Sequence, residues 1–103
     1  MMKDWIEISI PFMKGNEKKY LNQCINSNFV SSVGPFITEF ENNLSKLIGL
    51  DEEHSVATAS GTTALHIALL ANGVNPGDLV IMPTYTFIAT ANAVSHLGAS
   101  PWL

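Results

Sequence analysis

One serine, one glycine and two threonines stand where a short apolar segment passes into a helical pattern. The apolar segment is Ser55–Ala59, and the polar residues are Ser60-Gly61-Thr62-Thr63. Glycine allows a ligand to approach the backbone closely, and the first turn of a helix presents unpartnered N–H groups at the positive end of the helix dipole. The segment therefore predicts a phosphate site. The alternative is a plain helix cap, in which Ser60 or Thr62 satisfies the first turn.

The residues around this segment exclude two common phosphate motifs. No lysine follows Thr63, so the segment is not a Walker A loop. No second and third glycine follow Gly61 at the spacing of a dinucleotide-binding fingerprint. The phosphate hypothesis therefore depends on the start of the helix alone.

A second group of candidate residues directly follows the apolar run Leu79–Met82. It reads Pro83-Thr84-Tyr85-Thr86-Phe87. Open parallel sheets place their ligands beyond the carboxyl ends of the strands, which is where this group is expected to lie. An aromatic residue there could stack on a flat cofactor ring. The alternative is that Phe87 packs a helix against the sheet.

The histidines and the single cysteine carry weaker signals. His66 falls within a predicted helix and His96 falls late in another, where a cation suits the helix dipole, so we interpret both as structural or solvent-facing. His54 lies in a polar turn. Cys24 has no partner cysteine, which excludes an internal disulfide and most zinc sites, and we expect no metal site.

Helical and apolar periodicities predict the elements that position these residues. Residues 6–12 suit an extended lead-in, and two short apolar runs, 55–59 and 79–82, are typical of buried strands. A third strand begins after Pro101. Residues 75–78 predict a turn, with proline and glycine in their usual places. Helices are expected from residue 15 to about 25, from about 36 to 48, from about 61 to 71 and from about 86 to 97.

The alternation of strands and helices indicates the α/β class, with a mostly parallel sheet and flanking helices. We expect an N-terminal helical segment over 1–54 and the start of an α/β domain over 55–103. Open sheets usually have about four to six strands. Two strands and the beginning of a third therefore indicate a truncated chain.

Composition bounds the possible partners and the location. The 103 residues include five lysines, no arginine and nine acidic residues, which argues against nucleic-acid binding through a basic surface. The apolar runs are too short to span a bilayer, and the N-terminus lacks the pattern of a signal peptide. We expect a cytoplasmic protein that does not bind a membrane. Hydrophobic residues make up 47% and charged residues 14%, which indicates a surface that packs against further structure.

Taken together, three segments resemble the DegT/DnrJ/EryC1/StrS aminotransferases, which are pyridoxal-phosphate enzymes that act on nucleotide-linked sugars. These segments are 60–69, 74–78 and 83–94. Further upstream, residues 15–20 and 30–35, with Glu39-Phe40-Glu41 after them, are most similar to the branch associated with legionaminic acid and related 4-amino sugars.

The resemblance implies a fold, a cofactor and substrates. The chain would form the N-terminal part of the large domain of a fold type I aminotransferase. The backbone amides of Gly61 and Thr62, with the Thr62 hydroxyl, would hold the phosphate of pyridoxal 5'-phosphate, and Phe87 would stack on its ring. The complete enzyme would be a homodimer that moves an amino group from glutamate to a nucleotide-linked 4-keto-6-deoxy sugar.

The same resemblance implies that no catalytic residue lies in this sequence. The family uses a lysine to form the Schiff base, whereas all five lysines here precede residue 60 and none matches that position. We therefore expect the chain to be inactive alone. Two alternatives stay open: a sugar dehydratase of the same family, in which histidine replaces the lysine, and a noncatalytic binding or dimerisation module.

Overall fold

The computed structural model describes residues 9–51 and 54–103. The chain divides into two compact units, Met1–Glu39 and Phe40–Leu103, and each is described by itself. The extended lead-in expected at residues 6–12 lies partly outside the described residues. The polar turn expected around His54 lies partly outside them as well. The boundary expected between residues 54 and 55 stays a prediction.

The first unit holds helix α1, Glu17–Asn26, and the start of helix α2, Pro35–Leu47. Both helices confirm the sequence-based expectation to within about two residues. The ring of Tyr20 meets the ring of Phe36 edge-on, with 5.1 Å between their centroids. Cys24 is a half-buried residue of α1 with a free thiol.

The segment after α2 is tied to that helix and forms no strand, so the strand predicted at 55–59 is wrong. The hydroxyl of the fully buried Ser45 lies 2.9 Å from that of Ser55. The backbone N–H of Ala57 donates to Glu41 Oε1 at 2.7 Å. A strand requires a ladder of backbone bonds to a neighbouring strand, whereas these bonds go to side chains of α2.

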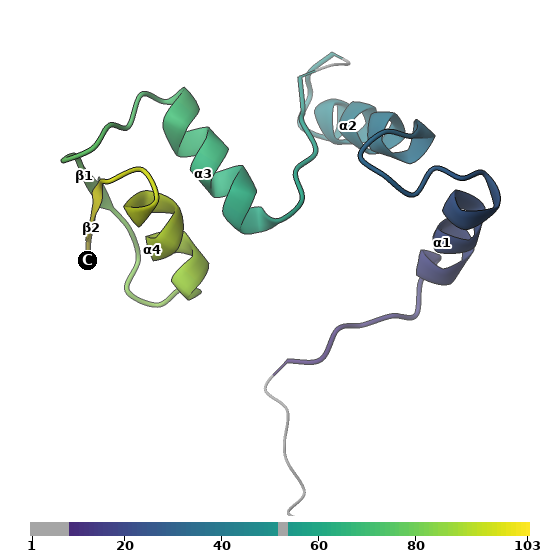
Figure 1. Ribbon diagram of the computed structural model, residues 1–103, viewed down its shortest axis with the longest axis horizontal. Helices are drawn as coiled ribbons and strands as arrows, with labels where there is room; N and C mark the ends of the chain where they lie inside the picture. The colour runs from purple at the N-terminus through teal and green to yellow at the C-terminus, as the bar shows by residue number, and fades with distance from the viewer. Residues whose placement is uncertain (1–8, 52–53) are drawn as a thin grey trace, which may run out of the picture. The chain divides into compact units, whose positions relative to one another are not determined.

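The rest of the second unit contains a strand–helix–strand unit with one further helix. Strand β1, Leu79–Ile81, pairs in parallel with β2, Ser100–Trp102, and helix α4, Ile88–Ser95, connects them. Helix α3, Gly61–Ala71, packs against α4, and Figure 1 shows the two helices side by side with the strands next to α4. The predicted α/β class is confirmed, including the parallel pairing and the flanking helices.

Helix α4 is shorter at both ends than the sequence pattern predicted. The expected helix began near Thr86, whereas Phe87 has the extended angles φ −66° and ψ 147° and the helix begins at Ile88. Thr86 and Phe87 therefore belong to the loop that follows β1. This correction bears on the site, because the side chains of loop residues can face a ligand in directions that a helical backbone would not allow.

The predicted turn at Asn75–Asp78 is present and is anchored by Gly98. The N–H of Asn75 is bound by Asp78 Oδ2 at 2.7 Å, and the N–H of Gly77 donates to the carbonyl of Gly98 at 2.9 Å. Gly98 has φ 73°, and a Cβ there would approach the Cβ of Pro76 to 3.1 Å. A side chain at residue 98 is therefore disfavoured by both conformation and space.

Few apolar side chains of the described residues are buried. The buried ones are Met82, Ala93, Val94 and Ala99. On β1, Leu79 is 66% and Ile81 78% exposed, although a continuously apolar strand is typical of a sheet covered on both faces. No described helix is long and apolar enough to cross a membrane.

We expect the 103-residue chain, expressed alone, to associate or to lack fixed packing, because so much apolar surface is exposed. The measurements are size-exclusion chromatography, binding of a hydrophobic dye and a thermal melt. The expected results are oligomers or aggregates, strong dye binding and a broad melt. A monodisperse monomer with one sharp cooperative transition would contradict this expectation.

Candidate functional site

A hollow of about 630 Å³ lies where the first turns of α3 and α4 approach each other. Its lining comes from both helices and from the loop before α4. The lining residues are Gly61, Thr62, Ala64, Leu65, Ala68, Thr86, Phe87, Ala89 and Thr90. The structure thus brings together the three residues that the sequence singled out, Gly61, Thr62 and Phe87, although Thr62 and Phe87 stand 25 residues apart along the chain.

Ser60 caps the first turn of α3 and leaves two amides of that turn available. Its side-chain oxygen accepts the N–H of Thr63 at 3.2 Å, and its carbonyl accepts the N–H of Ala64 at 3.0 Å. The N–H groups of Gly61 and Thr62 make no hydrogen bond to any described residue. The sequence left Ser60 and Thr62 as alternative caps, and the structure assigns the cap to Ser60.

Nothing in the described chain requires a glycine at position 61. Its φ lies outside the left-handed range, and a Cβ added there would meet no atom of the surrounding chain within 4 Å. Ordering a glycine in the first turn of a helix also costs more conformational entropy than ordering an alanine there. The missing side chain therefore leaves an open space directly beside two free amides.

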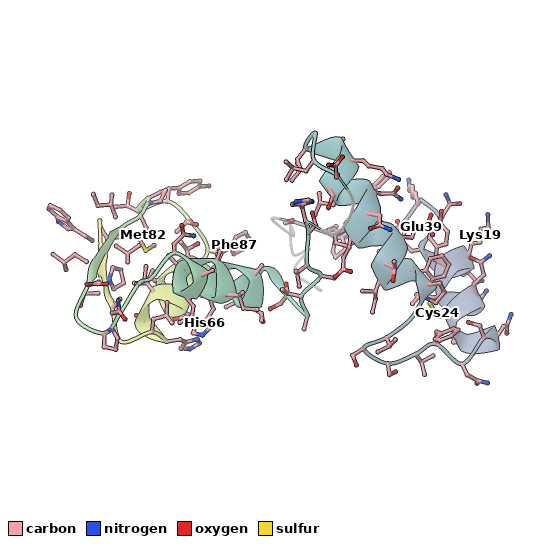
Figure 2. All side chains as sticks on the ribbon, turned by 90° about the horizontal axis from the view of Figure 1, so that it is seen from above. Lys19, Cys24, Glu39, His66, Met82 and Phe87 are labelled. Atoms are coloured by element: carbon pink, nitrogen blue, oxygen red, sulfur yellow. The ribbon has the colours of Figure 1, made fainter. Side chains whose placement is uncertain are left out.

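Phe87 faces the hollow with its ring largely free of protein contact. Its side chain is 85% exposed, in the extended loop before α4, and Figure 2 labels it together with His66 of α3. Both interpretations of Phe87, stacking on a cofactor ring and packing a helix against the sheet, stay predictions. A large apolar ring held open beside a hollow is suited to stacking on a planar ligand.

The hollow contains two hydroxyl groups to which the sequence analysis gave no role. Thr86 and Thr90 both line it, and their hydroxyl oxygens lie 3.0 Å apart. One of the two hydroxyl groups donates its proton to the other oxygen. The proton of the second hydroxyl is therefore free to donate to a ligand. Their spacing of four residues around the start of a helix was the sequence signal for such a pair.

No charged side chain in the described part of the chain lines the hollow. An anion there would be held by amides, hydroxyls and the positive end of α3, whose first turn carries no acidic residue. The hollow is otherwise apolar, with Leu65 among its lining residues. The arrangement fits a ligand with an anionic end and a flat ring, and by itself it contains no acid, base or nucleophile for a reaction.

The two helical histidines lie outside this hollow. The ring centroids of His66 and His96 are 6.2 Å apart, and His96 follows the last residue of α4. His66 Nδ1 is buried without a hydrogen-bond partner in the described part of the chain. Neither histidine lines the hollow, and their interpretation as structural or solvent-facing stays a prediction.

Residues 11–103 match the DegT/DnrJ/EryC1/StrS aminotransferase family. The chain belongs to this family. The resemblance drawn from the segments around Gly61 and Phe87 is thereby confirmed, and the match extends upstream through α1 and α2.

Two relatives are named as a GDP-perosamine synthase and a putative pyridoxal phosphate-dependent aminotransferase. The chain is 46% identical over 98 residues to GDP-perosamine synthase of Caulobacter vibrioides, covering 95% of this chain and 26% of that protein. It is 36% identical to the putative pyridoxal phosphate-dependent aminotransferase EpsN of Bacillus subtilis, covering 93% of this chain and 24% of that protein. The chain thus spans about a quarter of the length of these relatives. The narrower similarity to the legionaminic acid branch stays a prediction.

Solved aminotransferase structures share this fold. The aminotransferase TlmJ of Streptoalloteichus hindustanus superposes with a TM-score of 0.78 at 28% identity, covering 94% of this chain and 26% of that one. NtdA of Bacillus subtilis, solved with bound cofactor PMP, gives a TM-score of 0.71 at 34% identity, covering 97% of this chain and 25% of that one. The α/β arrangement around the hollow is therefore shared with these solved structures, one of which holds the cofactor PMP.

Proposed function

We propose that the whole protein that contains this chain is a pyridoxal-phosphate-dependent aminotransferase. It would transfer an amino group from glutamate to a nucleotide-linked 4-keto-6-deoxy sugar, as a cytoplasmic homodimer. The observation that carries the proposal is the hollow, which is lined by Gly61 and Thr62, whose amides make no hydrogen bond in the described chain, and by the exposed Phe87. The names of the relatives support the sugar-nucleotide substrate.

The residues of the hollow fit pyridoxal phosphate at its two ends. The amides of Gly61 and Thr62, with the Thr62 hydroxyl, would hold the phosphate, and the space over Gly61 admits it close to the backbone. Phe87 would cover one face of the pyridine ring. When bound, the cofactor supplies an electron-withdrawing ring that stabilises negative charge on the carbon bearing the amino group.

This chain's own residues would bind and orient, and the proton transfers would fall to residues elsewhere in the whole protein. The Thr62 hydroxyl would donate to a phosphate oxygen, and the apolar wall at Ala64 and Leu65 would exclude water from one side of the ring. The bound phosphate and the stacked ring would fix the orientation of the cofactor. A fixed orientation speeds a reaction because the reacting groups are already in place.

The proposed activity is tested by incubating the whole protein with pyridoxal phosphate, glutamate and a nucleotide-linked 4-keto-6-deoxy sugar. Mass spectrometry should show the ketone replaced by an amine, and 2-oxoglutarate should form in equal amount. Glutamine and aspartate serve as comparison donors. A deoxygenated sugar product without nitrogen would contradict the proposal and favour the dehydratase alternative.

Replacing Phe87 with alanine should weaken the binding of pyridoxal phosphate several-fold, because aromatic contacts of this kind contribute about 0.5–1.5 kcal/mol beyond burial. The absorbance of the bound cofactor should also shift, since one ring face becomes exposed to water. Tyr85→Ala is the matched control, because Tyr85 is fully exposed in the same loop and does not line the hollow. Equal affinities and spectra for the two variants would overturn the stacking role of Phe87.

A further inference from the structure

Several hydrogen bonds hold Ser60 in place at the N-terminus of α3. Its carbonyl accepts the N–H of Ala64 and also the hydroxyl of Thr58, each at 3.0 Å. Its side-chain oxygen accepts the N–H of Thr63 at 3.2 Å and lies 3.0 Å from the Thr63 hydroxyl. The backbone of Ser60 is extended, with φ −162° and ψ 161°. These bonds fix the direction in which the chain enters the helix.

This cap determines which amides of the first turn can meet a ligand. An α-helix leaves the N–H groups of its first turn without helical partners. The Ser60 side chain satisfies the third of them, at Thr63, so the amides of Gly61 and Thr62 stay as the free pair. Both of these residues line the hollow, whereas Thr63 does not.

The start of α4, at the same hollow, has no such cap. Phe87 occupies the capping position and makes no side-chain hydrogen bond to the first turn. Of the two helix starts that border the hollow, that of α3 has a side-chain cap on a backbone N–H, whereas at α4 the side-chain bond joins the hydroxyls of Thr86 and Thr90 and leaves the first-turn amides without a side-chain cap. Preorganised donors bind an anion more tightly, because the cost of ordering them is met during folding.

We propose that Ser60 is a positioning residue of the cofactor site, and this inference rests on the proposed function above. Ser60 does not hold the phosphate itself. Its hydroxyl oxygen accepts the Thr63 amide, which is then not free to bind the phosphate. The same bond keeps the Gly61 and Thr62 amides oriented toward the hollow. Without the cap the first turn would fray, and Gly61, which has the most backbone freedom to lose, would have to be ordered on binding.

The experiment measures the affinities of Ser60→Ala, in the whole protein, for pyridoxal phosphate and for pyridoxal, which lacks the phosphate. We expect about a two- to thirtyfold loss for pyridoxal phosphate, the usual range for losing a helix cap, and an unchanged affinity for pyridoxal. Ser60→Thr keeps a capping oxygen and should restore the affinity. An unchanged affinity of Ser60→Ala for pyridoxal phosphate would overturn the proposal.

Asn72→Ala is the matched control for stability. Asn72 caps the other end of α3, where its Nδ2 donates to the carbonyl of Ala68 at 2.8 Å, and it lies outside the hollow. Both alanine variants should lower the melting temperature, but only Ser60→Ala should lose phosphate-dependent affinity. Equal losses in both would reduce Ser60 to a stabilising residue and overturn the proposal.

The proposed function and the role of Ser60 fail in distinguishable ways. If Gly61→Val loses cofactor and Ser60→Ala does not, the site stands and the positioning role is wrong. If neither variant loses cofactor, the phosphate lies elsewhere and the proposed site is wrong as well.

Discussion

Replacing Gly61 with valine is expected to weaken the binding of pyridoxal phosphate about a hundredfold or more. The valine side chain would occupy the open space beside the free amides and separate the phosphate from both of them. Hydrogen bonds to a charged group contribute roughly 1.5–3 kcal/mol each, so losing two gives at least this effect. The measurement is a titration of the whole protein with pyridoxal phosphate, followed by absorbance.

The fold of the Gly61→Val protein should survive, which separates a lost site from a lost structure. A Cβ at position 61 meets nothing within 4 Å, so no clash within the described chain is expected. Ala71→Val is the matched control, because it adds a branched side chain to the last residue of α3, outside the hollow. If both variants bind the cofactor as tightly as the parent, the phosphate site is not at the start of α3.

Replacing Thr62 with alanine should loosen the binding of pyridoxal phosphate by about one to two orders of magnitude. The variant loses one hydroxyl donor to a charged group, which contributes roughly 1.5–3 kcal/mol. Its backbone amide remains, so the effect should be smaller than that of Gly61→Val. The same absorbance titration measures it.

Thr62→Ser is the control for the hydroxyl, because it keeps the donor and removes only a methyl group. It should bind pyridoxal phosphate within a few-fold of the parent. Pyridoxal without its phosphate should bind the parent and Thr62→Ala equally. A loss that is the same for both ligands would show that Thr62 acts through the shape of the hollow and not through the phosphate.

The elements around the site could be predicted from sequence because local signals mark them. Ser60 begins α3 as a capping residue, and the apolar run at 79–82 gives the strand β1 at Leu79–Ile81. The strand expected at 55–59 failed for a physical reason. Apolar character shows that a segment is suited to a sheet, but a strand forms only where a neighbour offers a backbone ladder, and Ala57 bonds to the side chain of Glu41 instead.

The site could be predicted only in part. The start of a helix at Ser60 made Gly61 and Thr62 candidates for a phosphate, whereas the stacking role of Phe87 is what the family resemblance implied. The hydroxyl pair of Thr86 and Thr90 depends on where α4 begins, and helix boundaries are a weak sequence signal.

The most direct test of the cofactor site is a crystal structure of the whole protein with pyridoxal phosphate bound. We predict phosphate oxygens within hydrogen-bond distance of the Gly61 and Thr62 amides and of the Thr62 hydroxyl. The ring of Phe87 should lie against one face of the pyridine ring. A phosphate bound at any other helix start or loop, with the hollow between α3 and α4 left to solvent, would contradict the site proposed here.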